Sequence, residues 1–357
     1  MKKTFKTYVS LLMTCIGVAS ISLLVSSCKN TSSTFVQATG KPGEIMLVME
    51  NEYMNAPIGA KVYGVLTQPA LSLTQDEPNF SISRVATPSF GDFLRYVRNV
   101  VIVDVDNTRF TSTALKYNYD EWAKGQIVIR LNTPSADSLS NYLDRNKAAL
   151  INLLVRHELY RFGTVLEDSY STRADELTDS LFKHHVNMPS DIKSYKVGKD
   201  FLWMSNGLAR KRHDILVYSF PFKNKKDIAI DRMVEVRDSV LKANIEGGVE
   251  GSYPTTESKY NLYHRYVQTA NGQIRGELRG IWKMEGGAMM SGPFVCQAYI
   301  DQKAGKVYVI EGFVYNPNEK KLTLLRMMEA GLYSFRPDNI KKFNAAEILE
   351  SKTSVMQ

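Results

Sequence analysis

Cysteine is scarce in this chain, with three residues among 357. Cys15 and Cys28 lie near the N-terminus, so Cys296 stands alone in the rest of the sequence. If the Cys28 thiol carries a lipid, Cys296 has no partner for an internal disulfide, which excludes the class of small exported domains that disulfide bonds hold together. Apolar residues alternate around Cys296 in PFVCQAYID, and this pattern predicts a thiol that is buried in a strand and unreactive.

Histidine is scarce too, and the spacing of the five residues argues against a metal site. His184 and His185 are neighbours, and adjacent side chains on a helix point about 100° apart, so they cannot hold the same ion. His157 precedes Glu158, but no second histidine follows at the helical spacing of a zinc protease. We therefore expect no metal ion and no cofactor.

Motifs of nucleophilic and phosphate chemistry are missing as well. Ser291 lacks the glycine two residues earlier that a nucleophile elbow requires, and a hairpin turn explains its position equally well. The Gly-rich stretch EGGVEGSYP has no lysine at the spacing that closes on a phosphate, and it is typical of a helix end followed by a loop. The sequence indicates no catalytic residue.

Long apolar runs are absent except for one at the N-terminus. Residues 8–25 are uncharged and mostly apolar, and they follow Lys2, Lys3 and Lys6, which is the layout of an export signal. A retained membrane-spanning helix needs about 20 apolar residues, and this run is at the short limit and contains serines. An ordinary secretory signal is the second possibility, since small residues precede a candidate cleavage point.

The third possibility is a lipoprotein signal, which the sequence favours. Val25, Ser26, Ser27 and Cys28 form the series of aliphatic, small, small and cysteine that directs a lipid onto the cysteine thiol. We expect removal of residues 1–27 and lipid attachment at Cys28. The protein would then be anchored to a membrane of the cell envelope, where nucleic acid is not an expected partner.

The segment after Cys28 is predicted to be a flexible tether over residues 28–40, because it is rich in Ser and Thr and has no periodicity. Loss of the three lysines in the signal lowers the formal net charge from +8 to +5. A moderately basic body held at a membrane is suited to contact with anionic head groups or wall polymers. The expected partner is an unidentified envelope protein, lipid or wall component.

The remaining chain predicts an α+β fold in two halves, residues 41–190 and 191–345, with a C-terminal tail at 346–357. Each half is expected to be an antiparallel sheet with helices packed on one face. VVIVDVDN and GQIVIRLNTP precede a leucine-rich helix expected to end at Gly163, and FVCQAYIDQ and GKVYVIEGFVYNP precede another. This parallel suggests that the halves are similar and arose by duplication.

One predicted hairpin carries the candidate ligand-binding residues. Asn271 and Gly272 separate two alternating segments, which is a strong hairpin signal. In QIRGELRGIWKME the charged residues fall on one face of the second strand, where arginines could bind a carboxylate or phosphate. The glycines of this strand would let a ligand approach its backbone. The alternative is a solvated sheet face whose opposite charges pair. The candidates are Arg275, Arg279, Lys283 and Glu285.

The lipobox, the GEIMLVM opening and the segment RGIWKMEGGAMMSGPFV, followed by KVYVIEGFVY, resemble a family of uncharacterised lipoproteins of Bacteroidota, domain of unknown function four-eight-three-seven. The resemblance is expected to cover nearly the whole mature chain, and it implies an envelope lipoprotein without assigned catalytic residues. In that phylum an acidic run after the lipidated cysteine favours the cell surface. Lys29, Asn30 and Thr31 depart from that pattern, which favours an outer-membrane location facing the periplasm.

Three functional hypotheses follow. The first is a non-enzymatic binding or scaffold module, held at the membrane by acylated Cys28. The second is an envelope hydrolase that acts on an anionic glycan or lipid, which requires a cleft where two carboxylates, or an acid and a nucleophile, converge. The third is a structural subunit of a larger envelope complex, which requires an apolar exposed patch larger than a monomer tolerates.

Overall fold

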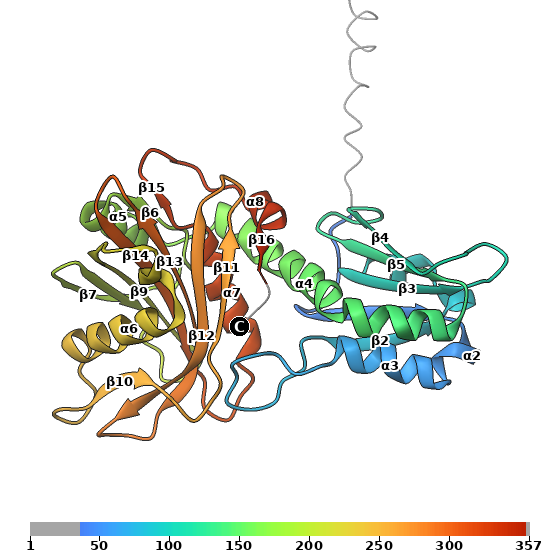
Figure 1. Ribbon diagram of the computed structural model, residues 1–357, viewed down its shortest axis with the longest axis horizontal. Helices are drawn as coiled ribbons and strands as arrows, with labels where there is room; N and C mark the ends of the chain where they lie inside the picture. The colour runs from blue at the N-terminus through green and yellow to red at the C-terminus, as the bar shows by residue number, and fades with distance from the viewer. Residues whose placement is uncertain (1–35, 355–357) are drawn as a thin grey trace, which may run out of the picture.

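The computed structural model describes residues 36–354, which form two units side by side (Figure 1). The signal segment and Cys28 lie outside the described residues, so cleavage and lipidation stay predictions. Within 36–354, every helix is too short or too polar to cross a membrane. The predicted α+β class with two halves is confirmed, although the halves differ from each other in ways that the sequence did not indicate.

The N-terminal unit is built on a five-stranded sheet in the order β2-β1-β3-β5-β4. Its strands are β1 (Glu44–Met49), β2 (Ser81–Ala86), β3 (Asn99–Val105), β4 (Ala114–Tyr119) and β5 (Ile127–Thr133). The pairs β1/β2, β1/β3 and β3/β5 are parallel, and only β4 runs antiparallel to its neighbour. The expectation of an antiparallel sheet is therefore wrong for this unit, whose central strands are buried on both faces, as parallel strands usually are.

Helices cover one face of this sheet. They are α2 (Asn51–Met54), α3 (Pro57–Leu66) and α4 (Ala136–Asp168). Pro57 occupies the first turn of α3, where its missing N–H costs nothing, and the Ser135 hydroxyl caps α4 by accepting from Ser138 N–H. Apolar side chains of α3 and α4 pack on Ile45, Leu47 and Met49. On the other face lie Leu94 of the 3₁₀ turn η2 (Asp92–Tyr96) and Phe90, which follows the 3₁₀ turn η1 (Thr87–Ser89).

The C-terminal unit is built on a nine-stranded sheet, antiparallel throughout, in the order β16-β11-β12-β13-β14-β9-β8-β7 with β10 beside β12. The strands are β7 (Ser194–Gly198), β8 (Phe201–Ser205), β9 (Arg212–Pro221), β10 (Tyr253–Thr256), β11 (Tyr263–Gln268), β12 (Ile274–Glu285), β13 (Ser291–Asp301), β14 (Lys306–Tyr315) and β16 (Lys352–Thr353). The predicted Asn271-Gly272 hairpin is confirmed, and Gly272 takes the positive φ that this turn requires.

Helices cover both faces of the larger sheet, so the expectation of one covered face is wrong here. The helices of this unit are α5 (Thr172–Phe182), α6 (Ile230–Asn244), α7 (Leu322–Tyr333) and α8 (Ala346–Glu350), and η3 (Lys225–Ile228) precedes α6. One face packs on α6, and the other packs on α5 and α7. The inner strands are buried along nearly their whole length because both of their faces are covered.

The two units are not copies of one another. The predicted duplication equates β3 and β5 with β13 and β14, but β3 and β5 pair in parallel while β13 and β14 pair antiparallel. A parallel pair needs a crossover connection, and the chain between β3 and β5 supplies one that includes β4. The sequence similarity therefore reflects two strand pairs with the same apolar composition and different topologies.

The unit boundaries differ from those expected. Helix α5 packs through Ala174 and Phe182 into the C-terminal core, so the units divide after Asp168 rather than at residue 190. Part of the predicted tether belongs to the fold, because Gln37 pairs with Lys124. The predicted tail is also structured, since α8 and β16 lie within it.

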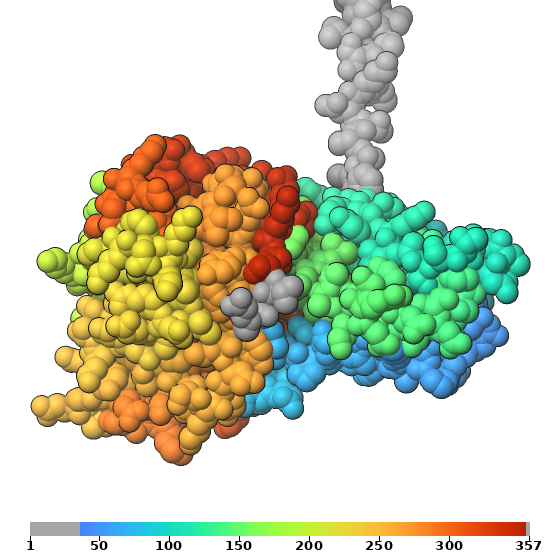
Figure 2. All heavy atoms as spheres, in the orientation of Figure 1, coloured from blue at the N-terminus to red at the C-terminus, as the bar shows by residue number. Residues whose placement is uncertain are grey.

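Helix α4 continues beyond Gly163, where it was expected to stop. A Cβ atom at Gly163 would lie 2.9 Å from Ile348 Cδ1 and 3.0 Å from Ala345 Cβ. Glycine at this position therefore lets the C-terminal segment approach the helix closely. In Figure 2 the green spheres of α4 lie against the red spheres of that segment, so α4 joins the two units.

A second contact between the units lies at the start of α7. Both carboxylate oxygens of Glu77 accept backbone N–H groups, at 2.7 Å from Lys321 and 3.1 Å from Leu322. This N-terminal unit residue therefore satisfies free N–H groups at the first turn of a helix in the other unit. Arg326 of α7 lies over the Phe80 ring, 4.9 Å from its centroid.

Candidate functional site

A pocket lies on the face of the nine-stranded sheet that carries α6. The helix ends at Asn244, and beyond it residues 245–248 and the turn between β12 and β13 lie over the sheet. These loops leave a cavity of about 150 Å³ against the strands. The pocket thus exists because α6 is shorter than the sheet face that it covers.

Aromatic side chains form the walls of this pocket. Trp203 comes from β8, Trp282 from β12, and Phe313 and Tyr315 from β14, at alternate positions that share the α6 face. The Trp282 ring meets Phe313 edge to face, with centroids 5.3 Å apart, and its Nε1 donates to the Val314 carbonyl at 3.2 Å. The walls are therefore held in place by packing and by a buried hydrogen bond.

Apolar side chains line the mouth of the pocket. Met284 and Met290 line it, and Ala288 stands in the turn between β12 and β13. Methionine side chains adapt to irregular apolar ligands because they are unbranched and polarisable. Gly247 also lines the pocket, and a Cβ atom there would lie 2.4 Å from Met284 Cε and 3.1 Å from Ser252 Cβ, so the absence of a side chain lets the loop approach these residues closely.

Two of the charged groups that line the pocket bind each other. The Asp214 carboxylate is fully buried and accepts from Arg212 Nε at 2.8 Å and from Trp203 Nε1 at 2.9 Å. The Arg212 guanidinium in turn lies over the Trp203 ring, 5.7 Å from its centroid. Glu246 is the third charged residue of the lining, and it is exposed. The arrangement suits binding of an apolar group beside a polar edge.

The candidate residues predicted from the sequence lie on the opposite face of β12, under α7. Arg275 is 3% exposed, and its guanidinium donates to the carbonyls of Leu332 and Phe335 and to Gln297 Oε1. Burial lowers the pKa of the Arg275 guanidinium to about 10. Arg275 therefore holds the end of α7 on the sheet, and it is not part of an exposed charged platform.

Arg279 belongs to a buried ion-pair network on the same face. Glu277 accepts from Arg265 Nε at 2.8 Å and from Arg279 Nε at 3.0 Å, and Arg279 also pairs with Glu329 of α7. Burial opposes ionisation of Glu277, but the two guanidinium groups outweigh it and lower the pKa of this carboxyl to about 2. Both sequence interpretations assumed a solvated face, and α7 excludes solvent from it.

Lys283 and Glu285 lie at the opposite end of β12, where the strand is exposed. Lys283 Nζ is 3.2 Å from a Glu285 oxygen and 3.8 Å from a Glu257 oxygen. The structure therefore divides the four candidates into a buried pair and an exposed pair, and does not bring them into one site.

The aromatic pocket was not predicted. Its signal in the sequence is the set of aromatic residues near the ends of three strands, but alternation cannot show which strand ends adjoin. Only the strand order, with β14 between β13 and β9, places the side chains of β8, β12 and β14 around one cavity.

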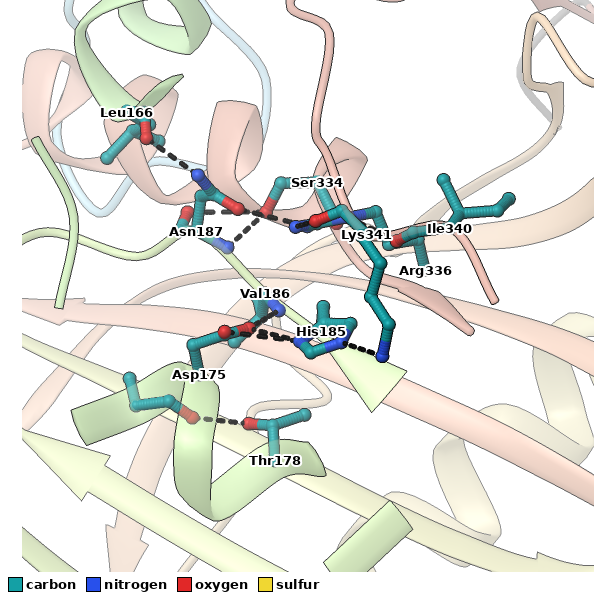
Figure 3. Close-up of polar contacts among 11 residues, drawn as sticks. Leu166, Asp175, Thr178, His185, Val186, Asn187, Ser334, Arg336, Ile340 and Lys341 are labelled. Atoms are coloured by element: carbon teal, nitrogen blue, oxygen red, sulfur yellow. Dashed lines mark hydrogen bonds and ion pairs between the residues drawn. The ribbon is translucent and has the colours of Figure 1, made fainter. Parts of the chain in front are cut away.

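A group of polar contacts around His185 lies elsewhere in the C-terminal unit (Figure 3). His185 Nδ1 is 3.0 Å from an Asp175 oxygen, and the same carboxylate accepts from Val186 N–H at 2.8 Å. Lys341 Nζ lies 3.4 Å from His185 Nε2. These contacts fasten the two-stranded ribbon of β6 (His184–His185) and β15 (Arg336–Pro337) to α5. No group of three or more His, Cys, Asp or Glu residues suited to a metal ion occurs within 36–354.

Cys296 is buried, as the sequence predicted. Burial raises the pKa of its thiol well above the ordinary value, which keeps it protonated and unreactive.

Family comparison divides the chain where the structure does. Residues 171–334 match the family described as Domain of unknown function (DUF4837), which confirms the suspected resemblance for the C-terminal unit. Residues 38–167 match a different family, Domain of unknown function (DUF8532), so the resemblance does not extend over the whole chain. The bacterial lineage stays a prediction. No curated protein matches the chain.

Two solved structures show a distant similarity to part of the chain. A mutant of the protein Mog1 is 10% identical, with a TM-score of 0.29, over 43% of this chain and 90% of that chain. The Ran-binding protein Mog1p of Saccharomyces cerevisiae is 9% identical, with a TM-score of 0.29, over 44% of this chain and 90% of that chain. Similarity at this level supports no argument about this protein.

Proposed function

We propose that this protein is a cell-envelope lipoprotein, anchored through acylated Cys28, that acts as a non-enzymatic binding module. Its binding site is the aromatic pocket of the C-terminal unit, which takes an apolar group of an envelope protein, lipid or wall component. The observation that carries the proposal is a cavity of about 150 Å³ walled by Trp203, Trp282, Phe313 and Tyr315.

Binding is favoured over hydrolysis by the state of the acidic groups in the pocket. A hydrolase needs two carboxylates, or an acid and a nucleophile, that converge on free space. Asp214 is fully buried and already accepts hydrogen bonds from Arg212 and Trp203. The remaining carboxylate of the lining, Glu246, lies in an exposed loop.

Blocking the pocket with a bulky residue tests the binding site. Ala288→Trp places an indole at the mouth, and Met289→Trp is the matched control because Met289 adjoins it in sequence, is fully exposed and does not line the cavity. The neutral fluorescent probe N-phenylnaphthylamine should bind the parent and the control, and Ala288→Trp should weaken it by about tenfold or more, which corresponds to about 1.4 kcal/mol. Equal binding by all three proteins would remove the pocket as the site.

Replacing the lipidated cysteine tests the anchor. Cys28→Ala should release the protein from membranes and block processing of the signal, because the thiol that receives the lipid is absent. Cys15→Ala is the control, since this cysteine lies in the segment expected to be removed. Membrane association and processing of Cys28→Ala at the parental level would contradict the lipid anchor.

A further inference from the structure

The charges of the pocket lining do not cancel. Arg212 and Asp214 form an ion pair, so together they contribute no net charge. Glu246, which follows α6 by two residues, has no hydrogen-bond or ion-pair partner within the described part of the chain, residues 36–354. The lining therefore carries one uncompensated negative charge.

The end of α6 adds to this negative potential. The helix points its C-terminus at the pocket, since residues 245–248 leave the helix and line the cavity directly. The last carbonyl groups of a helix carry a partial negative charge, which stabilises cations nearby. Lys242, the basic residue of the last turn, lies over the Tyr253 ring, 4.9 Å from its centroid, and is not part of the lining.

The aromatic walls favour the same sign of charge. The faces of Trp, Tyr and Phe rings are electron-rich and attract cations within about 6 Å of the centroid. One such contact is already present, because the Arg212 guanidinium lies over Trp203. The Trp282 ring plane is inclined at 66° to that of Phe313 and at 56° to that of Tyr315, so Trp282 is not stacked on either ring.

From these observations we propose that the pocket binds an ammonium group carried on a short apolar chain. The chain lies against the methionines of the mouth and the aromatic walls, and the ammonium lies between the ring faces, the end of α6 and Glu246. This assignment rests on the proposed function and names its ligand class. An anionic ligand is disfavoured because Arg212 uses Nε and Nη2 to bind Asp214.

A matched series of competitors tests the charge of the ligand. Hexylammonium, hexanol and hexanoate share one chain and differ in charge, and each is titrated against N-phenylnaphthylamine bound to the purified protein. Hexylammonium should displace the probe at a concentration about fivefold lower than hexanol, and hexanoate should require more than either. Equal or better displacement by hexanoate would overturn the ammonium assignment while leaving the pocket intact.

Two variants separate this inference from the proposed function. Glu246→Gln should reduce the preference for hexylammonium, because the ring faces and the end of α6 remain, and should leave the affinity for the neutral probe unchanged. Glu250→Gln, in the same exposed loop but outside the lining, should keep the preference. An unchanged preference in Glu246→Gln would remove this carboxylate from the assignment. Failure of the parent to bind the neutral probe would instead contradict the proposed function itself.

The ammonium group has two possible sources, a free amine or a lysine of a protein partner. A short peptide with one central lysine between leucines, and the same peptide with norleucine in its place, distinguish them. Displacement by the lysine peptide alone, at concentrations similar to hexylammonium, identifies a protein partner. Displacement by hexylammonium with no effect of either peptide identifies a small amine.

Discussion

The two faces of the nine-stranded sheet bury charge in different ways. On the α7 face, Arg265, Glu277, Arg279 and Glu329 form a network in which each carboxylate contacts more than one guanidinium. On the α6 face the buried carboxylates are held in separate pairs, Glu311 by the guanidinium of Arg237 and Asp214 by that of Arg212. The comparison shows that alternation of polar residues along β12 does not indicate that the polar face is exposed to solvent.

The difference between the faces also appears in their carboxyl groups. The two arginines beside Glu277 hold its pKa below the ordinary value in spite of burial. Burial raises the pKa of Glu311, because the single guanidinium of Arg237 does not offset the loss of water. The ionised form of Glu277 is therefore favoured on the α7 face, and the ionised form of Glu311 is disfavoured on the α6 face. This contrast can be tested by mutation.

Removing the shared acid of the α7 face should have the largest effect. Glu277→Ala leaves Arg265 and Arg279 buried with a single carboxylate, Glu329, between them, and should lower the free energy of unfolding by about 3–5 kcal/mol. Urea denaturation of the parent protein and the variant measures this loss. Glu285→Ala is the control, because Glu285 lies on the same strand and is exposed. A loss equal to that of the control would show that the network contributes no stability.

Two glycines of β12 test how closely the α6 face is packed. A Cβ atom at Gly276 would lie 2.3 Å from the Ile228 backbone carbonyl, whereas one at Gly280 would lie 2.4 Å from Leu262 Cδ2 and 2.8 Å from Phe294 Cε1, which are side-chain atoms. Gly276→Ala should therefore cost about 1–3 kcal/mol, and Gly280→Ala less, since side chains shift more readily than backbone. Thermal unfolding of the two variants measures the order. Equal losses would mean that the side chains of Leu262 and Phe294 are as fixed as the backbone.

The sequence predicted the local elements of this face but not what covers it. The Asn271-Gly272 turn, the alternation of β12 and the apolar strand around Cys296 are local patterns, and each is confirmed. The burial of Arg279 depends on Glu329, which lies 50 residues later in the chain. No local period encodes such a contact, so a charged strand face that is exposed to solvent and one that is covered by a helix show the same sequence pattern.

The parallel sheet of the N-terminal unit and the aromatic pocket were missed from the sequence for related reasons. Strands β3 and β5 carry the β-branched composition of any buried strand, and composition does not state whether neighbours run parallel. The pocket depends on where α6 ends relative to β8 and β14, which is a matter of tertiary packing. What the sequence predicts well is therefore the existence of elements, and what it misses is their order in space.

Lowering the pH should change the free energy of unfolding in opposite directions through Glu277 on the α7 face and Glu311 on the α6 face. Glu277 has a folded pKa of about 2, below its ordinary value of 4.5, so acidification protonates the unfolded state first and stability falls between pH 4.5 and 2. Glu311 has a raised folded pKa, so the folded state takes up its proton first and this contribution rises as the pH falls.

Denaturation at several pH values separates the two carboxyl groups. Glu277→Gln should flatten the loss of unfolding free energy between pH 4.5 and 3, by at most about 1.4 kcal/mol per pH unit for one titrating group. Glu311→Gln should make the loss steeper, because it removes a group that opposes it. If the two variants change the slope in the same direction, the contrast between the faces is wrong.

The exposed end of β12 should give the smallest effect. Lys283 was a candidate ligand contact, but its side chain points away from the pocket that its neighbour Met284 lines, and it pairs with Glu285 in solvent. Water and salt screen such a pair, so Lys283→Ala should leave both the unfolding midpoint and the affinity for N-phenylnaphthylamine within error of the parent. Met284→Ala, one residue along the strand, should weaken the probe because it removes part of the pocket wall. Loss of probe binding in Lys283→Ala would place ligand on the α7 side of β12, contrary to the division between the faces.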